Sequence, residues 1–552
     1  MSVRPGRTRR DTKKMECTGD MVSRREVLGG MVAVVVAGVA GRGDAVAVRD
    51  FELEEMTIEE LSKGMEEGRF SARGLVEKYL GRIEALDRKG PTLGHVIEVN
   101  PEAREIAERL DRARKEKGAR GRLHGVPILL KDNIDTGDRM GTTAGSWALA
   151  EKGAGRDAFL VKRLREAGVV ILGKANMSEW ANFRSTRSTS GWSARGGQGR
   201  NPYALDRTPS GSSSGSAGGV AADYCAAAVG TETDGSIVSP ASCCGVVGIK
   251  PTVGLVSRSG IVPIAHSQDT AGPIARTVAD AAILLGGMVG MDGEDEAMVK
   301  AGDRGERDYS QYLKRDGLRG ARIGVVRKGF GFGPKTEAVL ETAVAAMKSE
   351  GAIVVDPVEV ATVGKFGDAE TEVLLYEFKA GLEKYLAGRQ GVKFGTLMEL
   401  IEFNLREREW EMPYFGQELF VKAEGKGGLE SGEYVEALKK CRRMARDEGI
   451  DQAMAENRLD ALVAMTTGPA TLIDLVNGDY DSGGSSSLAA VAGYPSVTVP
   501  AGYVMGLPVG VSFMGRAFAE GVLVRLAYGF EQATKVRRSP GFGRAIELRA
   551  AF

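Results

Sequence analysis

Two serine-rich loops carry the residue types in this sequence that are most suited to chemistry. The first loop reads TPSGSSSGSAGG (208–219) and contains Ser212, and the second reads TETDGSI (231–237) and contains Ser236. A short alanine-rich stretch joins the loops, so the chain can hold two hydroxyl groups close to each other. A serine hydroxyl becomes a nucleophile when a base takes its proton. The pattern therefore favours covalent catalysis by a serine.

The chain offers few candidates for that base. It has only three histidines, of which we expect His124 and His266 to have structural roles. Lys131 ends the apolar stretch GVPILLKD (125–132), and burial can lower the ordinary lysine pKa of about 10.4 by ~3–5 units. Burial would therefore let the amine of Lys131 be neutral. Taken without other motifs, the favoured interpretation is a surface lysine that forms an ion pair with Asp132.

The glycine- and serine-rich loop has two other interpretations. Its composition is typical of a flexible linker, but the loop leads straight into a helical pattern and does not join two domains. A phosphate-binding loop needs a lysine before its last serine or threonine, and this loop has none. The stretch GGSSS (483–487) repeats the composition with no second serine loop after it, so we expect a backbone turn that lines the pocket.

Helical and strand patterns alternate around these loops, which indicates an α/β fold. Helices are predicted over 57–89, 101–117, 157–167, 216–230, 277–290, 335–349 and 368–387. Strands are predicted over 125–132, 168–173, 245–264, 321–326, 460–465, 496–500 and 508–515. A long loop is predicted over 181–217. These patterns place the two serine loops at the two ends of one short helix, which we expect to pack tightly against a sheet.

The composition excludes several function classes. The 552 residues include 74 basic and 74 acidic residues, so no excess of positive charge indicates nucleic-acid binding. The cysteines Cys225, Cys243, Cys244 and Cys441 form no CxxC pair and no metal-ligand spacing. We expect no metal and no cofactor, and we expect Cys243 and Cys244 to lie in a buried turn.

Residues 1–47 have the pattern of an export leader. The pair Arg24–Arg25 precedes an apolar run from Val27 to Ala40, and a small-residue cleavage site ends at Ala47. This order is typical of a twin-arginine signal. The apolar run is shorter than the ~20 residues of a membrane span, so we expect an exported, periplasmic or secreted protein with no stable membrane insertion after leader removal. The true start, Met1 or Met21, stays open.

Several motifs, taken together and in order, resemble the amidase signature hydrolases. They are GVPILLKDN (125–133), TPSGSSSGSAGG (208–219), GTETDGSIVSPASCCGVVGIKPTVGLVSRSGIVPI (230–264), SQDTAGPIART (267–277) and LAAVAGYPSVTVP (488–500). The resemblance covers about 55–540 and is greatest to the bacterial peptide amidases. It implies one large α/β domain over 48–552, with a mixed twisted sheet flanked by helices on both faces and a catalytic core at about 120–290.

The family's catalytic triad can be placed residue by residue on this sequence. The resemblance makes Lys131 the base, Ser212 the bridging serine and Ser236 the nucleophile, with Ser213 as a supporting hydroxyl. In the family a cis peptide bond precedes the bridging serine, and Gly211 suits that position. The backbone N–H groups that would bind the oxyanion belong to Thr233, Asp234, Gly235 and Ser236.

Two positions depart from the common family pattern and bear on the substrate. Many members have an arginine where this chain has Val238, so an anchor for a free carboxylate is missing. Asp234 adds an anion or a hydrogen-bond acceptor beside the nucleophile. Both changes favour an uncharged or amide-rich substrate. Asn182, in the loop before the first serine loop, is a candidate substrate contact or a residue that caps its own turn.

We therefore expect a serine amidase that releases ammonia from C-terminal peptide amides or similar small carboxamides. The partner is a small-molecule or peptide amide substrate, and the protein is a monomer or a homodimer. Alternatives are an aryl-acyl or fatty-acid amide hydrolase, the amide-hydrolysing component of a tRNA-dependent amidotransferase, and a non-catalytic exported binding protein. The acyl group size and the stereochemical preference stay open.

Overall fold

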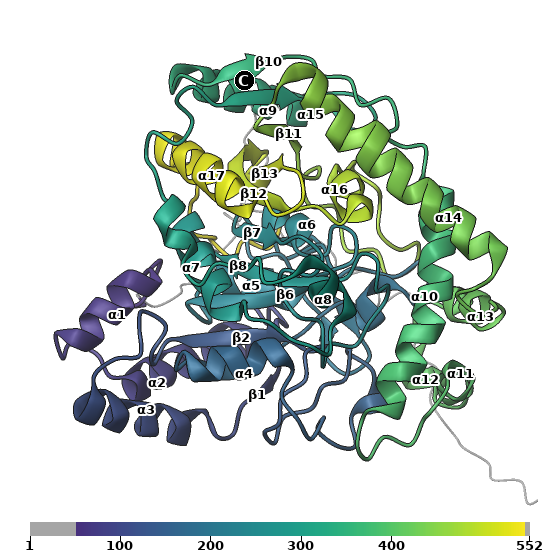
Figure 1. Ribbon diagram of the computed structural model, residues 1–552. Helices are drawn as coiled ribbons and strands as arrows, with labels where there is room; N and C mark the ends of the chain where they lie inside the picture. Colours follow the sequence, from purple (N-terminus) through teal and green to yellow (C-terminus); the bar gives the residue numbers. More distant parts are fainter. Residues whose placement is uncertain (1–50, 547–552) are drawn as a thin grey trace, which may run out of the picture. The chain divides into compact units, whose positions relative to one another are not determined.

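An eleven-stranded mixed sheet forms the centre of the protein (Figure 1). The computed structural model describes residues 51–546, and the leader predicted over 1–47 lies outside these residues. The strand order is β1-β3-β2-β6-β8-β7-β12-β13-β11-β9-β10. The strands are β1 Val96–Val99, β2 Pro127–Lys131, β3 Val170–Ala175, β6 Ala227–Glu232, β7 Val247–Lys250, β8 Thr270–Ala275, β9 Arg322–Val325, β10 Ile353–Val355, β11 Ala461–Met465, β12 Ser496–Val504 and β13 Leu507–Met514. A separate small hairpin pairs β4 Trp192–Ser193 with β5 Gly197–Gln198.

Strand β2 lies between β3 and β6 and runs parallel to both. Leu130 is paired with Lys174 on β3 and with Val229 on β6. In open α/β sheets, binding sites form at the carboxyl ends of the strands. Here the carboxyl ends of β2 and β6 bring Lys131 next to Thr231.

The residues of β2 and β6 suit strands that are covered on both faces. All five side chains of β2 and all six of β6 are buried, and nearly continuous apolar runs are typical of such strands. Small residues in β6 let the preceding helix approach closely. A Cβ atom on Gly230 would lie 2.8 Å from Ser213 Oγ, so this glycine leaves room for the first serine loop against the strand.

Helices flank the sheet. They are α1 Ile58–Glu66, α2 Ala72–Ile83, α3 Ala103–Lys117, α4 Phe159–Glu166, α5 Ser214–Ala221, α6 Val238–Cys243, α7 Val278–Met288, α8 Glu296–Ala301, α9 Pro334–Ser349, α10 Gly367–Ala387, α11 Leu397–Arg406, α12 Arg408–Glu411, α13 Glu418–Glu424, α14 Gly432–Arg442, α15 Gln452–Asn457, α16 Ser486–Ala492 and α17 Glu520–Thr534. Helix α5 packs on β2, β6 and β8, and α6 packs on β7, β12 and β13. Both helices begin directly after a serine loop.

The long helix α10 joins the sheet to a group of helices at one side (Figure 1). Its residues Phe378 and Leu382 share a hydrophobic cluster with Phe420 of α13 and with Trp180 and Ala265 from loops near the serine loops. Helix α14 packs along α10. These contacts hold the middle of α10 against the segments that contain Trp180 and Ala265.

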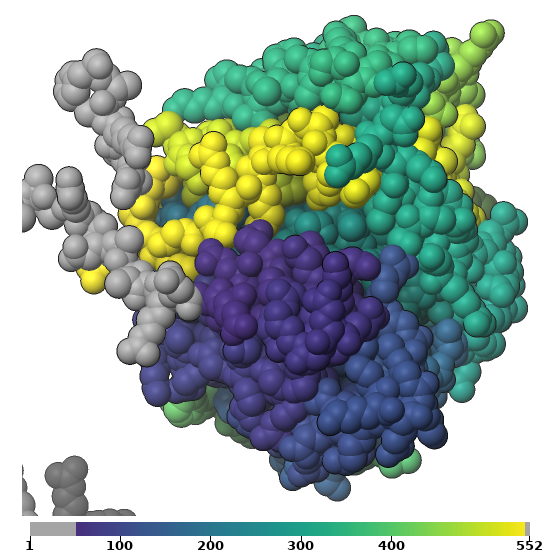
Figure 2. All heavy atoms as spheres, turned by 90° about the vertical axis from the view of Figure 1, so that its left-hand side faces the viewer, coloured from purple at the N-terminus to yellow at the C-terminus, as the bar shows by residue number. Residues whose placement is uncertain are grey.

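The two ends of the described chain pack against each other. The ion pair between Arg537 and Glu55 has a distance of 2.6 Å, and Phe542 belongs to the same hydrophobic core as Leu53. Figure 2 shows the first helices, in purple, directly below the C-terminal segment, in yellow. Residues from the beginning and from the end of the described chain therefore belong to one hydrophobic core.

The predicted fold class is confirmed, and three element boundaries were wrong. The helix predicted over 216–230 ends at Ala221, and Ala227–Glu232 forms β6, because sheet pairing overrides the helix propensity of alanine. The helix predicted over 57–89 is interrupted before Ser71, whose side chain caps α2.

Only Val247–Lys250 of the stretch predicted as strand-like over 245–264 forms a strand. Pro251 ends the ladder because it lacks an N–H group. Within residues 51–546, no helix is both long and apolar enough to cross a membrane.

Candidate active site

Lys131 lies at the carboxyl end of β2 with no exposure to solvent. Its Nζ atom is 2.7 Å from Ser212 Oγ, 2.9 Å from Thr231 Oγ1 and 3.1 Å from the Thr231 carbonyl oxygen. The amide of Asn133 also donates to Thr231 Oγ1, at 3.0 Å. The amine of Lys131 is therefore held by three oxygen atoms from two neighbouring elements.

The surroundings of Lys131 favour its neutral form. Burial lowers the pKa of Lys131 to about 7, and the more distant carboxylates of Glu232 and Asp269 act in the opposite direction. The alternative of a surface lysine paired with Asp132 was wrong. The Asp132 carboxylate is buried and accepts hydrogen bonds from the Thr143 hydroxyl and the Gly145 N–H.

The structure brings the two serine loops together through backbone contacts. The N–H of Ser213 donates to the Ser236 carbonyl oxygen at 3.1 Å. The Ser213 hydroxyl donates to the Thr231 carbonyl oxygen at 3.0 Å and accepts from the Thr231 N–H at 3.2 Å. Ser213 therefore braces the first loop against β6 and the second loop. No hydrogen bond joins the Ser212 and Ser236 hydroxyls among those of the described residues.

The turn from Thr233 to Ser236 connects β6 to α6. The four backbone N–H groups from Thr233 to Ser236 donate no hydrogen bond within residues 51–546, which leaves them available to an oxyanion. Gly235 has a φ of +76°, a conformation that glycine adopts without strain. The buried Glu232 carboxylate accepts from the N–H groups of Ile237 and Val238 at 2.7 and 3.0 Å, which fixes the start of α6.

Thr233 is held by Gln268 and Asp269, two adjacent residues to which the sequence analysis assigned no role. Its hydroxyl donates to Asp269 Oδ1 at 2.6 Å, and its carbonyl oxygen accepts from Gln268 Nε2 at 3.3 Å. Burial raises the pKa of Asp269 to about 6. Both residues lie in the SQDTAGP motif, which is the sequence feature that could have identified them. Their contacts with Thr233 could not be predicted because they depend on tertiary structure.

Gly211 lies where a side chain does not fit. A Cβ atom at this position would be 2.2 Å from Ser178 Oγ, and that hydroxyl is fixed by the Gly191 N–H at 2.9 Å. The peptide bond between Gly211 and Ser212 is cis, as the resemblance implies. The Ser178 N–H also donates to the Ser212 carbonyl oxygen at 3.1 Å, so Ser178 positions the backbone of Ser212.

Asn182 contacts its own loop in this structure. Its Nδ2 donates to Ser190 Oγ at 3.1 Å, and its φ is +68°. Its amide oxygen is buried and has no hydrogen-bond partner among the described residues. These contacts agree with the local role that the sequence analysis left open, and a contact with substrate stays a prediction.

The serines of GGSSS do more than form a backbone turn. The hydroxyls of Ser486 and Ser487, at the start of α16, each donate to a carboxylate oxygen of Asp234 at 2.5 Å. Asp234 therefore acts as a hydrogen-bond acceptor in the turn that carries Ser236, as expected. The sequence analysis did not predict the donors because they are about 250 residues further along the chain.

Among the described residues, no histidine or cysteine side chain forms a hydrogen bond with Lys131, Ser212 or Ser236. His124 contacts the Leu110 carbonyl oxygen at 2.9 Å, and His266 lies 3.4 Å from Glu377. Cys243 and Cys244 are buried at the end of α6, as predicted. In the described part of the chain, no group of three or more His, Cys, Asp or Glu side chains is arranged to hold a metal ion.

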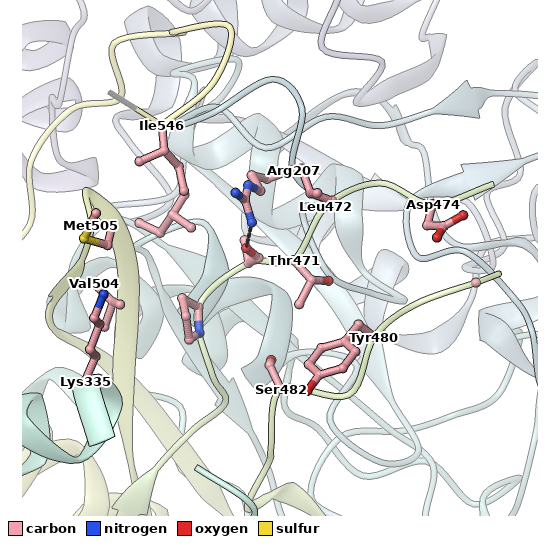
Figure 3. A pocket seen from close by; sticks show the side chains of 14 residues that line it. Arg207, Lys335, Thr471, Leu472, Asp474, Tyr480, Ser482, Val504, Met505 and Ile546 are labelled. Atoms are coloured by element: carbon pink, nitrogen blue, oxygen red, sulfur yellow. Dashed lines mark hydrogen bonds between the residues drawn. The ribbon is translucent and has the colours of Figure 1, made fainter. Parts of the chain in front are cut away.

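A separate cavity of about 530 Å³ lies beside the segment that follows β11 (Figure 3). Arg207 and Ile546 line one part of it, Lys335 and Met505 a second part, and Tyr480 a third. The guanidinium of Arg207 donates to the Ala470 carbonyl oxygen at 3.4 Å. The triad residues are not among its lining residues, so this cavity is distinct from the site around β2 and β6.

Most of the chain is similar to known amidases, both in sequence and in structure. A family model described as Amidase matches residues 74–524. A probable amidase of Arabidopsis thaliana is 45% identical over 501 residues, which cover 89% of this chain and 92% of that protein. The solved structure of a peptide amidase from Stenotrophomonas maltophilia has a TM-score of 0.86 and 50% identity, and the match covers 89% of this chain and 100% of that chain.

A third relative has a different described role. It is one component of the glutamyl-tRNA(Gln) amidotransferase of Halorhodospira halophila, and it is 37% identical over 497 residues, which cover 87% of this chain and 98% of that protein. The three relatives therefore match nearly the same share of this chain, although their described roles differ.

Proposed function

This chain belongs to the amidase family of amide-hydrolysing enzymes, and on that premise we propose that it is a serine amidase that cleaves C-terminal peptide amides with release of ammonia. The observation that carries the proposal is the contact between the buried amine of Lys131 and the hydroxyl of Ser212 at 2.7 Å. This contact places a base with a lowered pKa next to a hydroxyl in the loop that adjoins Ser236.

The first step is proton transfer. Neutral Lys131 donates its two N–H groups to Thr231 and keeps its lone pair for the proton of Ser212. Ser212 in turn takes the proton of Ser236 as the nucleophile attacks. A base of this kind contributes about 10²–10⁴-fold to the rate. The three oxygen atoms around the lysine amine orient its lone pair, because two of them belong to Thr231.

The second step is attack of Ser236 Oγ on the amide carbonyl carbon. A C–O bond forms, and the negative charge develops on the carbonyl oxygen. The free N–H groups of the turn from Thr233 to Ser236 would donate to that oxygen. Fixed donors of this kind stabilise the transition state, and loss of one costs about 10²–10³ in rate.

The third step is departure of ammonia. The C–N bond breaks as Ser212 gives its proton to the leaving nitrogen and regains one from protonated Lys131. An acyl-enzyme on Ser236 remains. Water then attacks the ester with the same proton relay, which releases the carboxylic acid and restores the free serine.

One residue of the site and one solved relative support an uncharged peptide amide as substrate. Val238, at the first position of α6, is buried, so it brings no cation to the nucleophile. The solved peptide amidase that matches this chain at 50% identity supports a peptide as the acyl part. In the proposal, Asn182 would accept a hydrogen bond from the substrate only after its side chain turns, because its amide oxygen is buried in this structure.

The test compares amides that differ in their leaving group. The proposal predicts ammonia release from dipeptide C-terminal amides by the purified protein, at a kcat/KM at least tenfold above that for anilides of the same acyl group. A faster reaction with anilides or long-chain fatty amides would favour the aryl-acyl or fatty-acid amide alternative. No turnover of any amide, together with no labelling of Ser236 by a fluorophosphonate, would favour the non-catalytic binding protein.

A further inference from the structure

The turn from Thr233 to Ser236, whose free N–H groups we assign to the oxyanion, must be fixed without the use of those N–H groups. Its carbonyl oxygens and side chains therefore have to hold it. At one end, the Ser236 carbonyl oxygen accepts from the Ser213 N–H at 3.1 Å. At the other end, directly after β6, the Thr233 hydroxyl donates to Asp269 Oδ1 at 2.6 Å, and the Thr233 carbonyl oxygen accepts from Gln268 Nε2 at 3.3 Å. Two side chains of one other segment therefore hold the Thr233 end.

The carboxylate of Asp269 is itself fixed by its own segment. Its second oxygen, Oδ2, accepts from the N–H groups of Ile264 and Ala265 at 2.8 and 2.9 Å. The Asp269 N–H donates back to the Ala265 carbonyl oxygen at 2.8 Å. We call this folded segment the 264–269 turn, and local bonds from a side chain to nearby backbone groups are typical of aspartate. One carboxylate thus uses one oxygen to close the 264–269 turn and the other to bind Thr233.

Helix α10 holds the same segment through two glutamates. Gln268 Nε2 also donates to Glu370 Oε1 at 2.9 Å, and the Ser267 N–H donates to Glu377 Oε2 at 2.9 Å. The two glutamates are about two helical turns apart, so they lie on one face of α10. Tyr434 of α14 in turn donates its hydroxyl to Glu377 Oε1 at 2.7 Å. The segment therefore connects α10 to the turn that binds the oxyanion.

We propose that Asp269 is a positioning residue that keeps the Thr233 N–H aligned with the oxyanion by fixing Thr233 to the 264–269 turn. The inference rests on the proposed amidase function. Asp269 does not need to touch the substrate, because its effect passes through the Thr233 hydroxyl. Without this bond the oxyanion-binding turn can move, and a misplacement of about 1 Å can cost about 10²-fold in rate. Because the charge on the oxyanion develops only in the transition state, the loss should appear in kcat and not in KM.

The test measures kcat and KM for a dipeptide amide in variants of the full protein. Asp269→Ala should lower kcat at least tenfold with KM within threefold of the wild type. Asp269→Asn should recover most of that loss, because its amide keeps an oxygen for the two backbone N–H groups and can donate to the Thr233 hydroxyl. Asp316→Ala, at an exposed aspartate in the loop before β9, is the matched control.

A double variant shows whether Asp269 acts through Thr233. Thr233→Val keeps the backbone N–H and the shape of the side chain but removes the hydroxyl, so it should also lower kcat at least tenfold. When Thr233→Val is combined with Asp269→Ala, kcat should be no more than about threefold below that of the less active single variant, because both changes break the same bond.

Three outcomes would overturn the inference. They are a wild-type kcat in Asp269→Ala or in Thr233→Val, a kcat of Asp269→Asn at least tenfold below the wild type, and a double variant whose loss equals the product of the two single losses. If Asp269→Ala does not fold, Thr233→Val and Asp269→Asn decide. If the wild type hydrolyses no amide but Ser236 reacts with a fluorophosphonate, the proposed function fails, and the labelling rates of the same variants test the positioning role separately. A wild type with neither turnover nor labelling would overturn both.

Discussion

Lys131 Nζ lies 2.7 Å from Ser212 Oγ, at the point where the parallel strands β2 and β6 end side by side. Because the amine is fully buried, its charged form is disfavoured. A lysine in this position can take a proton from a hydroxyl near neutral pH, which an exposed lysine cannot do to a useful extent.

Removal of the Ser236 hydroxyl should abolish turnover, and removal of the Ser212 hydroxyl should reduce it strongly. Ser236→Ala should lose all acyl-enzyme formation and all labelling by a fluorophosphonate. Ser212→Ala should keep a labelled Ser236 but reduce kcat by about 10²–10⁴-fold, since the proton relay is broken. Mass spectrometry of the labelled protein together with ammonia release measures both effects. Normal turnover in Ser212→Ala would contradict the relay.

A methyl group at Gly211 should be incompatible with the first serine loop. Gly211→Ala places a Cβ 2.2 Å from Ser178 Oγ, so the loop that carries Ser212 must shift. We expect kcat/KM to fall at least 10²-fold. The control is Gly81→Ala in α2, where nothing lies within 4 Å and alanine favours the helix by about 0.5–1 kcal/mol. Equal activity of the two variants would contradict the close packing at Gly211.

Ser213 should contribute to both stability and rate. Ser213→Ala leaves the buried N–H of Thr231 without its acceptor and removes one of the two donors to the Thr231 carbonyl oxygen. The loss costs about 1–3 kcal/mol of unfolding free energy. Because Thr231 also holds Lys131, kcat should fall. Urea denaturation and steady-state kinetics measure the two effects, with Ser349→Ala at the exposed end of α9 as the control. An unchanged denaturation midpoint and an unchanged kcat would contradict the bracing role.

Residues 1–47 are proposed to direct export, and this prediction is independent of the catalytic site. Expression of the full chain in a bacterium with a twin-arginine pathway should yield an exported protein that begins at Val48. Replacement of Arg24 and Arg25 by lysine should retain the protein in the cytoplasm. N-terminal sequencing of the fractionated protein measures the cleavage. Cytoplasmic retention of the wild type with an intact N-terminus would contradict the leader.

The sequence was sufficient to predict the α/β class and the residues whose roles depend on local motifs. Lys131 follows an apolar strand, and Ser212, Ser213 and Ser236 lie in two short loops. These loops come together because α5 leads away from the first loop and β6 returns to the second, whereas the single helix predicted over 216–230 would hold its ends about 20 Å apart. Gly211 was predicted through the resemblance, and the packing against Ser178 gives its physical reason.

Residues that depend on long-range packing could not be predicted in the same way. Ser486 and Ser487 lie in the GGSSS stretch, which was expected only to form a backbone turn, and nothing in that stretch indicates that their hydroxyls donate to Asp234. Asp269 lies in a quoted motif, yet nothing in that motif indicates that its carboxylate binds the hydroxyl of Thr233. The extent of the helix after the first serine loop was also wrong, because alanine propensity does not report sheet pairing.

The most direct test of the central claim is the rate at which a small fluorophosphonate labels Ser236 as a function of pH. This rate reports the base of the free enzyme and requires no knowledge of the natural substrate. Since Lys131 acts only when neutral and its pKa is about 7, labelling should fall as the pH drops below 7 and reach a plateau above it. In Lys131→Met the rate should be at least 10²-fold lower at every pH. A Lys131→Met variant labelled at the wild-type rate, or a wild-type profile that rises only near pH 10, would contradict the account.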